Sequence, residues 1–163
     1  MTQALLDGGT SSVLAMGDDE FGNPWPVGLR NPFVARPDAI GTWPHELGRL
    51  RLTELTLSSS AATDAGVSQP VESDVVNPRT GQPIVEPSAY AVVAADGATT
   101  EVLSTALCAI GRQAAEAYTK GRTDELLSAA VAIVRLDPPA DTHSSPSLTP
   151  LVLRRPGILY EHA

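Results

Sequence analysis

The chain has 163 residues, the length of one domain that can bury a core of its own. Its net charge of −8, with only 11 Lys and Arg, argues against a nucleic-acid partner, because phosphate backbones bind clustered cations. The single cysteine, Cys108, excludes an intrachain disulfide and a cysteine-based metal site. No stretch approaches the roughly 20 apolar residues that span a bilayer, and the first residues lack the basic and apolar regions of an export signal. We therefore expect a cytoplasmic protein without a membrane span.

The first half of the chain predicts short strands separated by turns rich in glycine and proline. Residues 12–16 and residues 25–30 are apolar runs bounded by such turns, so we expect them to pair as a hairpin. Residues 31–43 contain Pro32 and Pro37 with Gly and Asp neighbours, which predicts a loop. Residues 49–57 alternate polar and apolar side chains with a period of two, the pattern of a half-buried antiparallel strand.

A run of small polar residues follows this strand. Residues 58–64 read Ser-Ser-Ser-Ala-Ala-Thr-Asp, a composition that is typical of a plain loop. The alternative is that these hydroxyls donate hydrogen bonds to the phosphate or ring oxygens of a ligand.

Residues 74–81 end a strand and begin a turn with specific chemistry. Pro78 fixes its own φ and disfavours a helical conformation at the residue before it. Arg79 offers a forked cation, Thr80 offers a hydroxyl, and Gly81 permits a positive φ and the close approach of a ligand. The stretch is therefore either a Pro-Gly turn between strands or a turn that binds a phosphate or diphosphate.

The second half of the chain changes from strand to helix and back. Residues 89–95 predict a strand, after which apolar residues spaced by three and four predict a helix capped by Thr99 or Thr100 and ended by Gly111. The remaining expected elements are two helical stretches, a strand, a loop, and an edge strand or tail, at residues 113–119, 124–130, 131–136, 137–146 and 148–153. Together the patterns predict an α+β fold, in which a mostly antiparallel sheet carries helices on one face.

Four segments, in order along the chain, resemble signature segments of the FAD:protein FMN transferase (ApbE-like) family. Residues 74–81 resemble the signature H-x-x-[DN]-P-x-T-G. Residues 6–17 resemble the family's Gly-Gly strand and turn, residues 24–32 its strand with a Trp, a Gly and a Pro, and residues 100–111 its helix with a spaced Asp and Thr.

The resemblance implies a domain at residues 1–136, the C-terminal portion of such a transferase, followed by a Pro/Ser-rich loop and tail at residues 137–163. It implies the metal-dependent transfer of FMN from FAD to a Thr or Ser hydroxyl of a target protein. A family half that helps to enclose FAD is expected to be absent, so a separately encoded N-terminal half or a homo-oligomer is an expected partner. The residues that the resemblance implies for the flavin nucleotide are Gly8, Gly9, Ser59, Ser60, Pro78, Arg79, Thr80 and Gly81.

Glu101 and Thr105 are four residues apart on the predicted helix, so both side chains share one helical face. Without the resemblance, they fit a Glu favoured by the helix dipole and a Thr that satisfies its own backbone. The resemblance implies instead that they hold Mg²⁺, or Ca²⁺, through hard oxygen ligands, with Glu101 in place of the family's Asp.

Asp74 stands where the family signature has the His that takes the proton from the acceptor hydroxyl. The resemblance therefore implies that Asp74 is the catalytic base, although a carboxylate with an ordinary pKa of about 4 needs burial to work near neutral pH. The histidines of the chain, His45, His143 and His162, lie elsewhere. Three alternatives remain open: an FMN transferase, a flavin-nucleotide-binding module that has lost catalysis, and a decayed fragment without a ligand.

Overall fold

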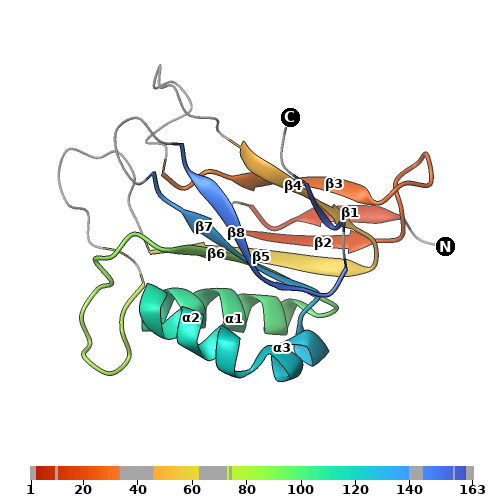
Figure 1. Ribbon diagram of the computed structural model, residues 1–163. Coiled ribbons are helices and arrows are strands. Elements are labelled where there is room, and N and C mark those ends of the chain that lie inside the picture. The colour runs from red at the N-terminus through yellow and green to blue at the C-terminus, as the bar shows by residue number, and fades with distance from the viewer. Residues whose placement is uncertain are drawn as a thin grey trace, which may run out of the picture.

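The computed structural model describes residues 3–9, 11–33, 46–62, 73, 75–139, 145–155 and 157–160. Within these ranges the chain forms nine strands and three helices (Figure 1). In chain order they are β1 (Ala4–Asp7), β2 (Ser12–Met16), β3 (Trp25–Arg30), β4 (Glu46–Leu52), β5 (Leu55–Ala61), β6 (Ala89–Ala94), α1 (Gly97–Ile110), α2 (Arg112–Gly121), α3 (Thr123–Ala129), β7 (Ala132–Asp137), β8 (Ser147–Leu153) and β9 (Leu159–Tyr160).

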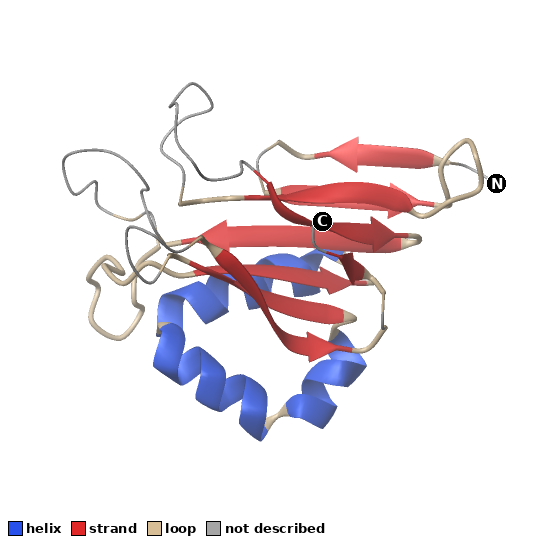
Figure 2. Cartoon of the chain, turned by 45° about the horizontal axis from the view of Figure 1, so that its top comes forward, coloured by secondary structure: helices blue, strands red, loops and turns tan. Residues whose placement is uncertain are grey.

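The elements form three layers. A six-stranded antiparallel sheet has the order β1-β2-β5-β6-β7-β8, and a smaller antiparallel sheet has the order β3-β4-β9. The helices cover one face of the large sheet and the small sheet lies over its other face, as Figures 1 and 2 show. The predicted α+β fold with helices on one face of a mostly antiparallel sheet is confirmed.

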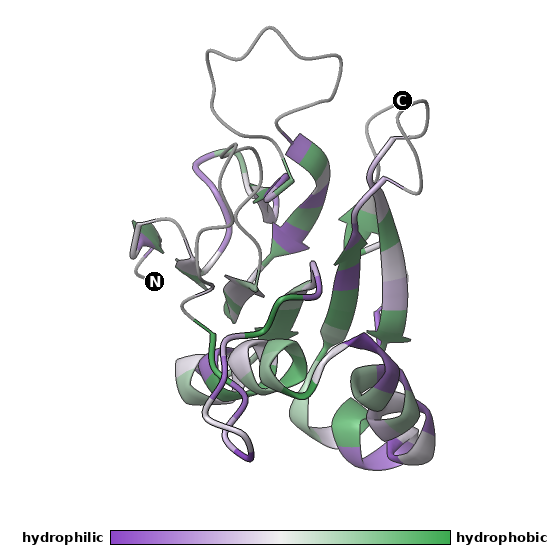
Figure 3. Cartoon of the chain, turned by 90° about the vertical axis from the view of Figure 1, so that its left-hand side faces the viewer, coloured by the Kyte–Doolittle hydropathy of each residue, from purple (hydrophilic) through white to green (hydrophobic). Residues whose placement is uncertain are grey.

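Strand β6 shows how one sheet can face two cores. All six of its residues are buried, and alternate side chains point to opposite faces. Ala91 and Val93 pack in the core between the two sheets, whereas Tyr90 and Val92 pack in the core beneath the helices. Its neighbour β7 is buried along its whole length in the same way. Green and purple bands alternate along strands of the sheets in Figure 3, which shows the same period.

Helix α1 begins at a different cap from the predicted one. Asp96, rather than Thr99 or Thr100, is the N-cap, and its carboxylate accepts a hydrogen bond from the Thr99 N–H at 2.8 Å. This hydrogen bond lowers the pKa of Asp96. Thr100 is 1 % exposed and its hydroxyl donates to the carbonyl of Gly97, so it lies inside the first turn. The predicted stop at Gly111 is confirmed, since this residue has a φ of 78° and follows the last helical residue.

The single strand predicted at residues 49–57 is wrong, because the chain changes sheets within it. Strand β4 ends at Leu52 in the small sheet, and β5 begins at Leu55 in the large one. Between them Glu54 adopts a φ of 52°, and its carboxylate accepts a hydrogen bond from the Gly17 N–H at 2.6 Å. The two consecutive polar residues before Leu55 break the alternation, which is the sequence signal of this turn.

The predicted hairpin between residues 12–16 and 25–30 is also wrong, although both strands exist. Strand β2 pairs with β1 and β5, whereas β3 pairs with β4. The connecting loop is held by the carboxylate of Asp19, which accepts hydrogen bonds from the N–H groups of Phe21 and Asn23. The loop therefore carries the chain from one sheet to the other instead of reversing it.

The later elements follow the predictions closely. The strand expected at residues 89–95 is β6, the two helical stretches are α2 and α3, and the strand expected at 131–136 is β7. Of the two alternatives for residues 148–153, the structure has the edge strand, β8, which pairs with β7. No helix of the described chain is long and apolar enough to cross a membrane.

A buried ionic cluster ties α2 to β7 and β8. The Arg135 side chain is 8 % exposed and pairs with Asp137 at 2.6 Å and with Glu116 of α2. Asp137 also accepts a hydrogen bond from Thr149 of β8 at 2.5 Å, and Arg112 of α2 lies 3.3 Å from its carboxylate. Burial alone lowers the pKa of Arg135, but the hydrogen bonds and charges of Asp137 and Glu116 raise it above its ordinary value. The cluster fixes the helical layer to the sheet that carries the candidate site.

Candidate functional site

Polar side chains gather where α1 lies over β2 and β5. Strand β5 places two serines on its helical face because every second residue points the same way. Helix α1 places its polar residues against them at spacings of one turn. We call this group the hydroxyl seam, and it consists of Ser12, Ser58, Ser60, Glu101, Ser104 and Thr105.

Ser60 lies at the centre of the hydroxyl seam. Its Oγ is 3.0 Å from Oγ of Ser104 and 3.0 Å from Oγ1 of Thr105. Ser104 is in turn 3.2 Å from Oγ of Ser58, and both of these serines are fully buried. The chain of hydroxyls therefore runs from the interior to Thr105, which is exposed.

The Gly8–Gly9 turn is connected to the seam through Ser12. The hydroxyl of Ser12, the first residue of β2, donates a hydrogen bond to the carboxylate of Glu101. The Gly8 N–H donates to the Ser12 carbonyl at 2.8 Å, and a Cβ at position 8 would lie 3.2 Å from that oxygen. Gly9 has a φ of 100°, and its N–H donates to the carboxylate of Asp7. A turn of this shape suits glycine at both positions.

The serine-rich run is a strand as far as Ala61, so the expectation of a plain loop is wrong for residues 58–61. Its backbone pairs with β6, and the register places Ser59 opposite Ala91 and Ser60 opposite Tyr90. Because neighbouring residues of a strand point to opposite faces, Ser60 faces α1 and Ser59 faces the small sheet. The two serines that were predicted to bind one nucleotide therefore lie on different sides of the large sheet.

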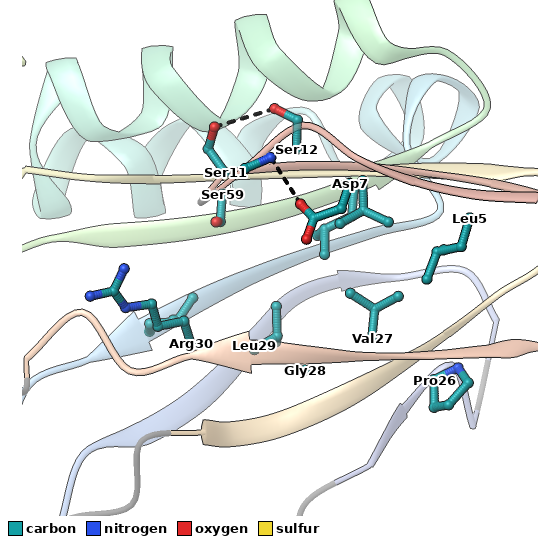
Figure 4. A pocket seen from close by; sticks show the side chains of 14 residues that line it. Leu5, Asp7, Ser11, Ser12, Pro26, Val27, Gly28, Leu29, Arg30 and Ser59 are labelled. Carbon is teal, nitrogen blue, oxygen red and sulfur yellow. Dashed lines mark hydrogen bonds between the residues drawn. The ribbon is translucent and has the colours of Figure 1, made fainter. Parts of the chain in front are cut away.

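Ser59 lines a pocket between the two sheets, with a volume of about 430 Å³. In Figure 4, Asp7, Ser11, Ser12 and Ser59 lie on one side of it, and Pro26, Val27, Leu29 and Arg30 of β3 lie on the facing side. Gly9 lines the same pocket. The inter-sheet pocket has the size of pockets that bind small molecules, and Ser12 belongs both to its wall and to the seam.

The predicted turn after residue 74 is present. The N–H of Gly81 donates to the carbonyl of Asn77 at 2.9 Å, the N–H of Arg79 donates to the Asn77 side chain at 2.9 Å, and Gly81 has a φ of 69°. Pro78, Arg79, Thr80 and Gly81 are all exposed. The hydrogen bonds of this turn that involve described residues stay between positions 75 and 84, and none joins it to the hydroxyl seam.

Asp74 lies outside the described residues, as do His45, His143 and His162. The role of Asp74 as a base therefore stays a prediction. Its neighbours Ser73 and Val75 are described, and the Ser73 hydroxyl accepts a hydrogen bond from the Val75 N–H at 3.1 Å.

Helix α1 carries both residues that were predicted to bind a metal ion. Glu101 and Thr105 lie one turn apart on the exposed face of α1 and offer a carboxylate and a hydroxyl, the hard ligands that Mg²⁺ and Ca²⁺ accept. Within the described ranges, no three His, Cys, Asp or Glu side chains are grouped so that they could hold a metal ion. The two residues therefore fit such an ion as part of a ligand set and do not form a complete one.

Cys108 lies beneath the seam, where its thiol is buried. Its thiol donates to the carbonyl of Ser60 at 3.1 Å, and the residue is 0 % exposed. Burial raises the pKa of the thiol to about 12, so it stays protonated near neutral pH.

The sequence predicted Glu101, Thr105 and Ser60 as site residues, but three members of the seam were missed. Ser12, Ser58 and Ser104 are ordinary serines whose importance depends on their partners in space. A signal was nevertheless present, because Ser58 and Ser60 have the spacing of one strand face and Ser104 lies one turn after Glu101.

Comparisons with known proteins show which family profile and which solved structures the chain resembles. The ApbE family profile matches residues 1–129, and no curated protein matches the chain. Three similar solved structures are the ApbE protein of Thermotoga maritima MSB8 (TM-score 0.57, 22 % identity), the flavin transferase ApbE of Vibrio cholerae (0.59, 15 %) and the flavinyl transferase ApbE of Pseudomonas stutzeri in its apo form (0.58, 20 %). They cover 82 %, 85 % and 85 % of this chain, which spans 39 %, 39 % and 38 % of theirs.

Proposed function

Because the chain belongs to the ApbE family, we propose that it binds a flavin nucleotide and acts in the transfer of FMN from FAD to a Thr or Ser hydroxyl of a target protein. The observation that carries the proposal is the hydrogen bond from Ser12 to Glu101. It joins the Gly8–Gly9 turn to the helix with Glu101 and Thr105, so two segments that resemble family signatures meet at one place. Ser60 of β5 completes the same place through Thr105.

The proposed reaction replaces the phosphoanhydride bond of the FAD diphosphate by a phosphate ester bond to the acceptor. The oxygen of the acceptor hydroxyl attacks the phosphorus on the FMN side of the FAD diphosphate, and the bond to the AMP oxygen breaks. AMP leaves with the electron pair of that bond, and the hydroxyl proton passes to a base, for which we propose Asp74. The products are a flavinylated protein and AMP.

Glu101 and Thr105 would hold Mg²⁺ or Ca²⁺, which supplies positive charge to the diphosphate. Arg79 would add a second cation from the exposed turn, and the positive φ of Gly81 lets the diphosphate approach the backbone there. The inter-sheet pocket would hold an apolar part of the nucleotide, supported by its mixed lining of leucine, valine and serine side chains.

A second candidate is a binding module that holds the nucleotide without transferring FMN. Two observations favour it: Asp74 stands where the family signature has His, and the chain spans 38–39 % of the similar flavin transferases. Under either candidate we propose that a further polypeptide, an N-terminal half or a second copy, completes the enclosure of the nucleotide. Leu5 and Leu6 on the edge strand β1, 39 % and 51 % exposed, offer a surface for it.

One experiment separates the candidates. The purified protein is incubated with FAD, Mg²⁺ and a Thr-containing acceptor protein, and AMP release and covalent flavin fluorescence are measured. Metal-dependent AMP release with labelled acceptor supports the transferase. Retained FAD without AMP supports the binding module, and absence of both rejects the proposal.

A further inference from the structure

Thr105 differs from three other threonines in the helices of this chain. Thr100, Thr119 and Thr123 each donate their hydroxyl proton to a carbonyl three or four residues earlier, as is common for threonine in a helix. The hydroxyl of Thr105 instead points to Ser60 on β5, at 3.0 Å. A contact with another element therefore decides where its proton lies.

The direction of each hydrogen bond in the seam follows from counting protons, since a serine hydroxyl has one proton and two lone pairs. Ser104 donates to the Glu101 carbonyl at 3.3 Å, because a carbonyl can only accept. For its contacts with Ser58 and Ser60 to be hydrogen bonds at the same time, its two lone pairs have to accept from both of these hydroxyls.

The same count continues to the surface. In this fully satisfied arrangement Ser60 uses its proton on Ser104, so Thr105 donates to Ser60. The lone pairs of Thr105 are left to face outward, and the exposed end of the chain of hydroxyls is an acceptor.

A second, shorter chain ends at Glu101. An ionised carboxylate can only accept, so Ser12 donates to it, and Ser11, at 3.3 Å, donates to Ser12. Glu101 therefore also presents lone pairs and negative charge to solvent.

We propose that Ser60 and Ser104 are positioning residues that orient Thr105 as an acceptor, so that this face of α1 selects a divalent cation and rejects a bare phosphate. This inference rests on the proposed function, because it explains how Glu101 and Thr105 prefer a metal ion. A phosphate oxygen placed directly on the same face would meet only lone pairs and a carboxylate, and would be repelled. A nucleotide diphosphate therefore reaches this face only with a cation between them.

The test uses Mn²⁺ as the probe, with free Mn²⁺ counted by its electron paramagnetic resonance signal. Ser60→Ala and Ser104→Ala each remove a hydroxyl that orients the Thr105 hydroxyl. We therefore expect each to weaken Mn²⁺ binding about three- to tenfold, the effect of one hydrogen bond. Ser58→Ala is the matched control: it removes a buried hydroxyl that donates to Ser104 but leaves the direction at Thr105 unchanged. We expect it to lower the melting temperature without weakening Mn²⁺ binding. Ser60→Thr should restore binding, because it restores the hydroxyl.

Each outcome decides the inference. It is overturned if the wild type does not bind Mn²⁺, if Ser60→Ala binds it as tightly as the wild type, or if Ser58→Ala weakens binding as much as Ser60→Ala. FAD binding, measured separately by flavin fluorescence, tests the proposed function. If the wild type does not bind FAD but the variants show the expected order of Mn²⁺ affinities, the proposed function is rejected and the inference stands. If the wild type binds FAD but the variants bind Mn²⁺ with equal affinity, the inference is rejected and the proposed function stands.

Discussion

Replacing Arg135 by Met tests the energetics of the buried ionic cluster. The substitution keeps most of the side-chain volume and removes the charge that faces Asp137, whose side chain is 11 % exposed, and Glu116, which is 35 % exposed. Removal of one partner from a buried pair typically costs about 3–5 kcal/mol, because the other charge is left uncompensated.

The cost is smaller here because Asp137 keeps two partners, Arg112 at 3.3 Å and the Thr149 hydroxyl. Arg112 is 41 % exposed, however, and water screens its charge. We therefore expect Arg135→Met to lower the free energy of unfolding by about 2–4 kcal/mol, or the melting temperature by roughly 5–15 °C.

Urea unfolding followed by circular dichroism measures this change. The matched control is Arg122→Met, which removes an ion pair with Glu125 whose side chains are 52 % and 64 % exposed, and should cost no more than about 1 kcal/mol. The double variant Arg135→Met/Asp137→Leu should be less destabilised than Arg135→Met, because it leaves no uncompensated charge at position 137. Equal losses for Arg135→Met and Arg122→Met would refute the reasoning.

Three further predictions concern buried hydroxyl and thiol groups and the base. Tyr90→Phe should leave stability unchanged or raise it by up to about 1 kcal/mol in urea unfolding, because the buried hydroxyl has no hydrogen-bond partner among the described residues; a clear loss would reveal a partner. Burial raises the pKa of both Tyr90 and Cys108 to about 12, from 10.0 and 9.0, so both groups bind protons more tightly in the folded state. The contribution of these two groups to stability should be constant below pH 9 and fall as the pH rises toward 12, and Tyr90→Phe/Cys108→Ala should remove most of this fall in a series of thermal melts. Asp74→His should raise AMP release from FAD, because imidazole has a pKa of about 6.5, and Asp74→Asn should abolish it. Identical AMP release from the wild type and both variants would rule out Asp74 as the base.

The sequence predicted the parts of the fold that depend on local patterns. Strand β6 was found because residues 89–95 form a continuous apolar run, and helix α1 because its apolar residues recur at spacings of three and four. The assignment of strands to two sheets was missed, because Thr53 and Glu54 redirect the chain through contacts with Asp18 and Gly17 of another loop. The break in the alternation at Thr53 and Glu54 is visible in the sequence, but these contacts join residues distant in sequence, so no local pattern shows which sheet each strand joins.

The candidate site was predicted in part for the same reason. Glu101 and Thr105 share a helical face by spacing alone, and the structure confirms that spacing on α1. Ser59 and Ser60 were grouped together because the family resemblance implied both of them for the flavin nucleotide. Pairing with β6 makes it a strand and separates them. Ser60 belongs to the seam and Ser59 to the inter-sheet pocket, and this becomes visible only when β5 is paired with β6.

We propose that Glu101 and Thr105 hold a divalent cation through which the flavin nucleotide binds. The most direct test is a titration of FAD with the protein, followed by flavin fluorescence, at millimolar Mg²⁺ and with the metal removed by EDTA. We expect FAD to bind tightly only with Mg²⁺, and we expect Glu101→Ala and Thr105→Ala each to lose most of this metal dependence while they still unfold cooperatively. FAD affinity that is the same with and without Mg²⁺ in the wild type would contradict it.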